Sequence, residues 1–453
     1  MGGTFKIRAE LILAAFARKK NLPKRSGKPF QDALLMEPLG AFGPGEGTIQ
    51  TNVAATAQVP KVAVAAALDA FFDYGPYGGR NNLASRAGAK MDSGTALYTE
   101  KVNYNRRMIE EFIGIDGEKD IVLYGMNTSD LIGKLACMCR YSKDDIILVP
   151  TMEHTSNNLP WRNSGATVIR VRQKPDGLID EADLEGKLSE NNGNVRIVAF
   201  TAASNINGMR PDVGKLARLV HEYGALAAVD CAQYAPHFPM SKTEWGADFV
   251  VFSGHKLGAR GGVLAASAEW LKDRLPVIPG GGTIADLHVG RDGGLEPVWA
   301  EREAKHQPGT WPTIEIVTLG AVVEKMMERW KEIMAREHEL LVYALQRFSE
   351  IPGFRPLLRI SPKALGEFPT PLVTFNLEGY TASELSARLS ENGIQNRGGD
   401  KDPICNHEFV RGLEPGGIVR LSFSYHNTMG EIDEIADVLR KMRKERPLSG
   451  AGD

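Results

Sequence analysis

Cysteine is scarce in this chain, and its copies are scattered. The 453 residues include only Cys137, Cys139, Cys231 and Cys405, and no two of them form a Cys-x-x-Cys pair. The sequence therefore predicts neither a disulfide framework nor a zinc site, and it indicates no other metal site. A reducing compartment is the default for such a chain, so we expect the protein in the cytoplasm.

An excess of charge and a long apolar run are also missing. With 54 Lys and Arg against 56 Asp and Glu, the formal net charge is −2. This balance gives no electrostatic case for a nucleic acid or a membrane surface as partner. No run of about 18 apolar residues occurs, so the sequence predicts no transmembrane helix.

The N-terminus is basic. Its first 28 residues contain a single acid, Glu10, which interrupts any apolar core of a secretory signal. We interpret residues 1–47 as a segment that packs near a C-terminal domain and includes an amphipathic surface helix. A transit peptide has the same composition, which keeps an organelle matrix as the alternative location.

Short apolar runs alternate with segments of helical period in the first two thirds of the chain. Continuous hydrophobicity in such runs indicates strands that are covered on both faces, as in a mainly parallel sheet between helix layers. The fold class is therefore α/β, with a large domain over residues 48–330. The seven predicted strands are 120–125, 144–150, 166–171, 195–201, 225–230, 248–253 and 261–267.

A second body follows. A long helical pattern covers residues 314–350, and strand-like runs at 371–377 and 418–424 flank a helix at 382–391. These elements predict a small α+β domain over residues 331–453, with the long helix joining the two bodies.

Polar and titratable residues gather where the predicted strands end. They are Asn127, Thr128 and Ser129 after the first strand, His154 after the second, Asn205 after the fourth, Asp230 on the fifth, and His255 and Lys256 after the sixth. Ligands of open α/β sheets bind outside the carboxyl ends of the strands, so one site can collect all of these residues.

Lys256 is the most informative of them. A lone lysine after a buried strand usually extends its amine to the solvent. In a partly desolvated pocket, however, a lysine amine has a lowered pKa and can form a Schiff base with pyridoxal phosphate. That cofactor also needs an acid at its ring nitrogen, a flat group on its ring and donors for its phosphate.

Each of these needs has a candidate. Asp230 suits the ring nitrogen, although an acid at a strand end is also common in turns. Thr128 and Ser129 suit a phosphate at a helix N-terminus, and an ordinary pair of helix caps would look the same. His154 either stacks on the ring or is a loop histidine.

Several stretches then carry a family resemblance. They are NTSDLI, PTMEHTSNNLPW, TAASNINGMRPDV, VDCAQYAPH, ADFVVFSGHKLGARGGV, PGGGTI, PGTWP and VRLSFSYHNT, in this order between about residues 48 and 440. The chain resembles the class V aminotransferase family of fold-type I pyridoxal phosphate enzymes, in its cysteine desulfurase and selenocysteine lyase branch. The resemblance implies a homodimer, a small amino-acid substrate and an acceptor protein for sulfur.

The resemblance also implies roles for individual residues. Lys256 forms the Schiff base, His154 stacks on the ring and moves protons, Asp230 pairs with the ring nitrogen, and Gln233 bonds the phenolic oxygen. Thr128, Ser129, Ser253 and His255 hold the phosphate, and Thr310 reaches it from the other subunit. Asn205 lies near the ring and substrate, and Arg420 binds the substrate carboxylate.

Cys405 is the candidate for the sulfur-carrying cysteine. It follows Arg397 by eight residues (405 − 397), a longer gap than in close desulfurases, and we expect His407 to favour its thiolate. With that thiolate, the predicted reaction converts cysteine to alanine and a Cys405 persulfide.

Other reactions stay open. If Cys405 is an incidental loop residue, a β-lyase that forms pyruvate and ammonia without an enzyme thiol fits as well. Transamination and epimerisation also occur on this scaffold. A catalytically silent scaffold protein is the alternative outside enzymes, and it has no physical need for Lys256, Asp230 and His154 together.

Overall fold

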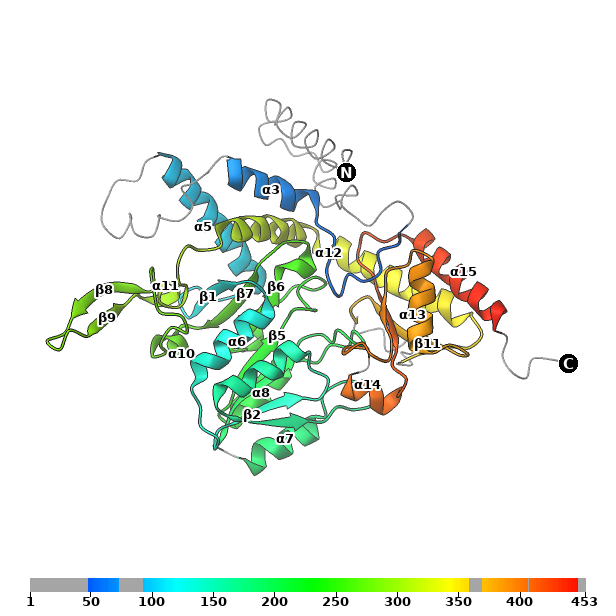
Figure 1. Ribbon diagram of the computed structural model, residues 1–453, viewed down its shortest axis with the longest axis horizontal. Helices are drawn as coiled ribbons and strands as arrows, with labels where there is room; N and C mark the ends of the chain where they lie inside the picture. The colour runs from blue at the N-terminus through cyan, green and yellow to red at the C-terminus, as the bar shows by residue number, and fades with distance from the viewer. Residues whose placement is uncertain (1–47, 73–92, 192, 358–368, 406, 447–453) are drawn as a thin grey trace.

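A computed structural model describes residues 48–72, 93–191, 193–357, 369–405 and 407–446 (Figure 1). The predicted N-terminal segment 1–47 lies outside these ranges. The described part contains a large sheet with helices on both faces and a smaller sheet, joined by a long helix. Within it, no helix combines the length and the apolar composition needed to cross a membrane.

The large sheet confirms the predicted architecture. Its strand order is β1-β7-β6-β5-β4-β2-β3, with β2 to β6 parallel and β7 antiparallel to both β6 and β1. The strands are β1 Asp120–Gly125, β2 Ile146–Pro150, β3 Thr167–Val171, β4 Val195–Thr201, β5 Leu226–Asp230, β6 Phe249–Ser253 and β7 Gly262–Ser267. Each strand ends at the residue predicted from its apolar run.

Apolar side chains leave both faces of this sheet. In β1, Val122 and Tyr124 enter one core cluster, whereas Ile121 and Leu123 enter another. The first face carries α3 Lys61–Phe72, α5 Ser93–Ile113, α7 Glu181–Glu190, α8 Val213–Glu222 and part of α12 Thr313–Ser349. The second carries α6 Thr128–Cys139, α10 Ala268–Lys272 and the 3-10 helix Leu159–Ser164. This double coverage explains why the strands read as continuous apolar runs.

Several shorter helices lie in the connections between these elements. They are α9 Lys242–Trp245, α11 Arg302–His306 and the 3-10 helices Thr155–Asn157 and Gly254–Leu257. A hairpin of β8 Ile284–Val289 and β9 Leu295–Trp299 extends away from the body of the molecule (Figure 1). Four of its large apolar side chains are exposed: Leu287, Val289, Leu295 and Val298.

Helix α12 passes from one core to the other. Its backbone leaves helical geometry at Arg329, where φ is −124° and ψ is 15°. Ile333 still packs in the core of the large sheet, whereas Leu340 and Phe348 pack in the core of the smaller one. The kink therefore lies close to the point where the helix changes its packing partners.

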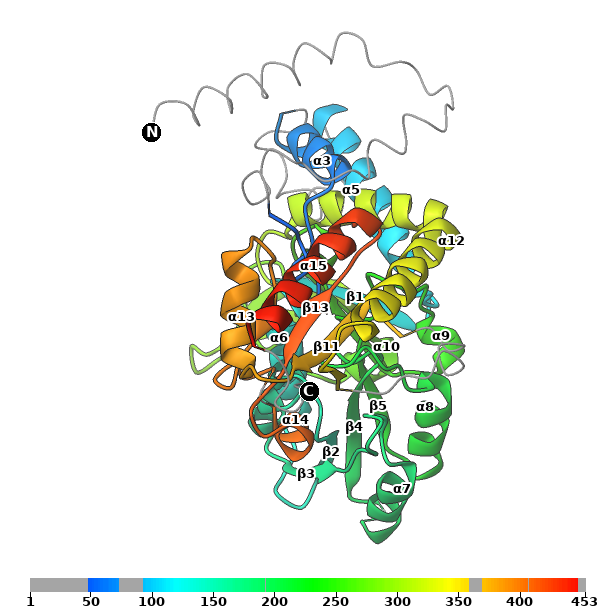
Figure 2. The same ribbon diagram turned by 90° about the vertical axis from the view of Figure 1, so that its right-hand side faces the viewer.

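The smaller sheet is antiparallel, with the order β10-β11-β13-β12. Its strands are β10 Phe354–Pro356, β11 Leu372–Leu377, β12 Arg397–Gly398 and β13 Val419–Ser422, and its helices are α13 Ala382–Glu391, α14 Glu408–Leu413 and α15 Met429–Glu445. Figure 2 looks onto this side of the molecule, with α13 and α15 in front. α13 has the bounds predicted from the sequence.

The first described residues contact both sheets. Ile49 and Asn52 form isolated bridges with Ile394 and Ser422 of the smaller sheet region. A few residues later, the N–H of Ala57 donates to the carbonyl of His255, beside the large sheet (3.1 Å). Residues 48–57 thus link the two bodies next to the expected site.

Candidate active site

Lys256 lies in the loop between β6 and β7, at the carboxyl end of the parallel strands. Ser253 pairs with Gly262 across the two strands, and the N–H of Gly254 donates to the carbonyl of Gly261 (2.8 Å). A Cβ on Gly254 would lie only 2.5 Å from the carbonyl oxygen of Arg260. Glycine at this position therefore allows the tight return that holds Lys256.

The amine of Lys256 lies near the side chains of Gln233 and Asp230. Its Nζ donates a hydrogen bond of 3.3 Å to Oε1 of Gln233. Burial lowers the pKa of Lys256 to about 8, although the nearby charge of Asp230 acts in the opposite direction. Near pH 8 a large fraction of this amine is neutral, which is the form that attacks a carbonyl compound.

Asp230 is the last residue of β5 and is buried. One carboxylate oxygen, Oδ1, accepts a hydrogen bond of 2.8 Å from the N–H of Ala232. Burial raises the pKa of Asp230, while that hydrogen bond and the charge of Lys256 lower it. The structure thus brings the predicted acid and the predicted lysine together.

His154 follows β2 and carries an uncharged ring. Its Nδ1 accepts a hydrogen bond from the N–H of Ser156 (3.2 Å) and contacts the hydroxyl of the same residue (2.9 Å). Burial lowers the pKa of His154 to about 4, and the positive charges of Lys256, Arg397 and Arg420 act in the same direction. A neutral, fixed imidazole beside Lys256 suits contact with a flat ring.

Hydroxyl groups meet at the N-terminus of α6. The helix is capped by Asn127, whose side chain accepts from the N–H of Asp130, so Thr128 and Ser129 are not its caps. Both the N–H and the hydroxyl of Thr128 contact Oγ of Ser253, at 2.8 and 2.7 Å. The hydroxyl of Ser129 contacts that of Ser156, beside His154. A helix N-terminus with such donors suits a phosphate.

Glycine lets the strand that follows Lys256 approach this helix start. A Cβ on Gly262 would lie 2.7 Å from backbone atoms of Asn127. The first residue of β7 and the cap of α6 therefore touch directly, and this contact fixes the position of Thr128 relative to Ser253.

Two further predicted phosphate ligands make other contacts in the structure. The ring of His255 bonds the carbonyl of Ala55, and burial lowers the pKa of His255. Thr310 is exposed, in the segment between α11 and α12. Among the described residues it makes no hydrogen bond to the Lys256 group, while its neighbour Trp311 packs against Tyr124 and Arg106.

Arg420 reaches the same edge from β13 of the smaller sheet. Its side chain is 1% exposed, and its Nη atoms donate to the carbonyl of Asn205 (2.6 Å) and to Oδ1 of Asn52 (3.2 Å). Its Nε is buried without a hydrogen-bond partner, and burial lowers the pKa of Arg420 to about 10. A buried donor without an acceptor is consistent with a site for a substrate carboxylate.

Cys405 is buried completely. It packs with Met152, Ile206, Val410 and Ile418, and its Sγ contacts the carbonyl of Arg397 at 3.4 Å. Burial raises the pKa of the Cys405 thiol to about 12, although the charges of Arg420 and Arg397 lower it.

The expectation that His407 favours a Cys405 thiolate is wrong. The Nδ1 of His407 accepts from the N–H of Phe409 and caps α14 instead. The pKa of the thiol is raised, and the burial of Cys405 among apolar side chains is the physical reason.

The sequence reasoning missed three buried titratable residues. Glu153 accepts hydrogen bonds from the N–H of Thr201 (2.8 Å) and from Nδ2 of Asn157 (2.7 Å), and burial raises its pKa to about 8. His237 and Glu337 form a buried pair, with Nδ1 and Oε2 2.9 Å apart. The position of Glu153 next to His154 was an available signal, whereas Glu337 belongs to a distant helix.

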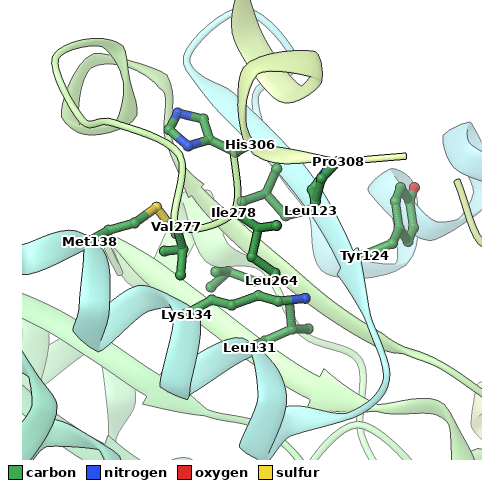
Figure 3. A pocket seen from close by; sticks show the side chains of 10 residues that line it. All are labelled: Leu123, Tyr124, Leu131, Lys134, Met138, Leu264, Val277, Ile278, His306 and Pro308. Atoms are coloured by element: carbon green, nitrogen blue, oxygen red, sulfur yellow. The ribbon is translucent and has the colours of Figure 1, made fainter. Parts of the chain in front are cut away.

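A separate apolar hollow lies beside α6 and β1 (Figure 3). Its volume is about 10 Å³, room for about one water molecule. Lys256 is not among its residues, which are Leu123, Tyr124, Leu131, Lys134, Met138, Leu264, Val277, Ile278, His306 and Pro308. The hollow is too small for a substrate, so the Lys256 group stays the candidate active site.

The residues around Lys256 fit the cofactor that the sequence predicts. The group offers a neutralisable amine, a buried carboxyl group, an uncharged imidazole and hydroxyls at a helix N-terminus. These are the amine, the ring partners and the phosphate donors that pyridoxal phosphate requires.

Comparisons with known proteins identify the family of this chain. The family model described as aminotransferase class-V matches residues 51–435. A probable cysteine desulfurase of Halalkalibacterium halodurans is 32% identical over 412 residues, covering 88% of this chain and 94% of the relative. One of Streptomyces coelicolor is 30% identical over 417 residues, covering 88% and 93%.

Solved structures also match. The apo structure of a cysteine desulfurase from Thermococcus onnurineus has a TM-score of 0.76 and 25% identity, covering 88% of this chain and 95% of its own. The cysteine desulfurase CsdA from Escherichia coli, with a TM-score of 0.71, 24% identity and coverage of 93% and 100%, shares the fold.

Proposed function

Because this chain belongs to the class V aminotransferase family, we propose that it binds pyridoxal phosphate at Lys256 and cleaves the carbon–sulfur bond of cysteine. One observation carries the proposal: the amine of Lys256, with its pKa lowered to about 8, lies beside Asp230, Gln233 and His154 at one sheet edge. The relatives named as probable cysteine desulfurases support the choice of substrate. The product in this proposal is alanine.

The cofactor supplies an electron sink when it is bound. Lys256 would hold it and move the proton at the substrate α-carbon, Asp230 would hold the ring nitrogen, and Gln233 would contact the ring oxygen. His154 would pack against the ring. Thr128, Ser129, Ser253 and His255 would hold the phosphate, and Arg420 with Asn205 would orient the substrate carboxylate.

Cys405 accepts the sulfur in this proposal. Its thiolate attacks the sulfur of the substrate, the new bond joins the two sulfur atoms, and the electron pair of the broken carbon–sulfur bond stays with the substrate carbon. Protonation of that carbon gives alanine. The positive charges of Arg397 and Arg420, which act on the thiol, support this role.

A β-lyase is the second candidate, and the burial of Cys405 favours it. A thiol with a pKa of about 12 carries almost no thiolate at neutral pH. In a β-lyase the sulfur-bearing group leaves the substrate directly, and the remaining fragment yields pyruvate and ammonia without an enzyme thiol.

We also propose a homodimer in which Thr310 completes the phosphate site of the partner subunit. The exposure of Thr310 and of the apolar side chains Val289 and Leu295 on the β8–β9 hairpin supports an interface on this side. A sulfur-acceptor protein then takes the persulfide sulfur from Cys405. The four free thiols support a reducing compartment such as the cytoplasm.

The division into a large domain of residues 48–330 and a small domain of residues 331–453 also stays a proposal. The kink at Arg329 and the change of core between Ile333 and Leu340 support a boundary in this part of α12.

Product analysis tests the reaction. The purified protein is incubated with cysteine and with thioether conjugates, and alanine and pyruvate are measured for wild type, Cys405→Ala and the exposed-site control Cys137→Ala. We expect alanine from wild type and control, and its loss in Cys405→Ala with the visible absorption of the cofactor retained. Equal amounts of pyruvate from all three proteins would contradict the desulfurase reaction and support the β-lyase reaction. A wild-type protein without visible absorption would refute cofactor binding itself.

A further inference from the structure

A chain of buried hydrogen bonds leads away from Lys256. Nζ of Lys256 donates to Oε1 of Gln233 (3.3 Å), and Nε2 of Gln233 lies 3.3 Å from Nε2 of His237. Nδ1 of His237 is 2.9 Å from Oε2 of Glu337. Gln233, His237 and Glu337 are at most 4% exposed, so water does not compete for these contacts.

Hydrogen-bond chemistry fixes the direction of this chain. An amide nitrogen only donates, so Nε2 of His237 must accept from Gln233. The ring proton of the neutral imidazole is then on Nδ1, and it points at the carboxylate of Glu337. If Nε2 carried the proton instead, it would attract the amide oxygen of Gln233 and turn the amide N–H groups toward Lys256.

Glu337 is well placed to hold His237 in this state. It lies on α12 between Ile333 and Leu340, which belong to different cores. Besides the imidazole, its carboxyl group accepts a hydrogen bond from the backbone N–H of Tyr425, three residues after β13 ends (425 − 422). The same strand carries Arg420. The carboxylate is thus fixed by donors from two parts of the chain.

We propose that His237 and Glu337 are positioning residues that fix which end of the Gln233 amide faces the nitrogen of Lys256. This inference rests on the proposed cofactor site at Lys256. An amide oxygen that faces this nitrogen stabilises its protonated form, whereas amide N–H groups there disfavour it. His237 and Glu337 therefore raise the pKa of the Lys256 nitrogen through Gln233, and they do so without touching cofactor or substrate.

The test is a pH titration of the visible absorption band of the holoenzyme. Glu337→Met removes the acceptor for His237 with little change in size, and His237→Phe removes the acceptor for Gln233. We expect both to lower the apparent pKa of the band by about one pH unit, the effect of one hydrogen bond that favours one protonation state. The matched control is Glu339→Met, on the same helix but exposed and paired with Arg336.

The outcomes separate this inference from the proposed function. A wild type without a visible band would refute the cofactor site. A wild type with the band, and an unchanged apparent pKa in either variant, would refute the positioning role. A shift of the same size in the Glu339→Met control would refute it as well.

Neutron diffraction of the wild-type holoenzyme in D₂O tests the same point if neither variant folds. The proposal requires deuterium on Nδ1 of His237 and none on Nε2. Deuterium on Nε2, directed at Gln233, overturns it.

Discussion

The Lys256 loop and the Cys405 loop offer the two reactive groups of the proposed reaction, and burial affects them in opposite ways. It lowers the pKa of Lys256 to about 8 and raises that of Cys405 to about 12. Desolvation favours the neutral form in both cases. For an amine the neutral form is the nucleophile, whereas for a thiol it is the unreactive form. The same physical cause thus favours the reactive form of the lysine and the unreactive form of the cysteine.

Removal of the Lys256 amine is expected to have the largest effect on activity. Lys256→Ala is expected to lose product formation from every substrate by at least about 10³-fold, because both covalent attachment and proton transfer depend on this group. Cys405→Ala, in contrast, should lose only the formation of alanine as a product. Product assays check this, with Lys119→Ala at an exposed lysine as control. Residual activity of Lys256→Ala within tenfold of wild type would contradict the role of Lys256.

Alkylation rates measure how strongly burial suppresses the reactivity of the Cys405 thiol. At pH 8, iodoacetamide should modify Cys405 at least about 10²-fold more slowly than the exposed Cys137, because it is buried and largely protonated. The rate should rise about tenfold per pH unit toward pH 10, since the thiolate fraction grows below a pKa of about 12. Mass spectrometry of the labelled peptides gives both rates. Equal labelling at pH 8 would mean that Cys405 opens readily to the solvent.

The pH dependence of cofactor uptake tests the amine. Below its pKa of about 8 the amine is mostly protonated, so uptake by cofactor-free protein should rise about tenfold from pH 6 to pH 7. It should level off above pH 8, when most of the amine is neutral. The growth of visible absorption after mixing reports the rate. A rate that continues to rise beyond pH 9.5 would indicate an ordinary lysine.

Two glycine substitutions test how rigid the contact between β7 and the start of α6 is. Their expected effect is the smallest of these predictions. Gly262→Ala places a methyl group 2.7 Å from the backbone of Asn127 and should lower the free energy of unfolding by about 1–3 kcal/mol. Gly133→Ala, inside α6 with no atom within 4 Å of the new Cβ, should raise it by up to about 1 kcal/mol. Denaturant titrations compare the two, and equal stabilities would show that the contact is easily relieved.

The sheet and the Lys256 group were predictable because their signals are local. Each strand is a continuous apolar run, and Asp230, Gln233 and Lys256 follow strand ends that meet at one edge. The sequence left open whether Thr128 and Ser129 cap α6, and the structure assigns the cap to Asn127 instead.

The missed features depend on contacts between distant segments. Cys405 is buried by Met152 and Ile206 of the large-sheet loops, which its neighbours in sequence do not reveal. The ring of His255 bonds Ala55, from a segment about 200 residues earlier in the chain (255 − 55). Glu337 is one of many acids on an amphipathic helix, and only the packing of α12 against residues 233–237 distinguishes it.

The reversed direction of β7 has a mechanical consequence. A parallel neighbour of β6 would need a long crossover, but β7 turns back at once, and residues 254–261 leave and re-enter the same ladder. The main chain of Lys256 is therefore anchored at both ends, and only its side-chain torsions remain adjustable. In the proposed chemistry, the amine would therefore reach the cofactor and move away from it by rotation of the Lys256 side chain, while the backbone stays in place.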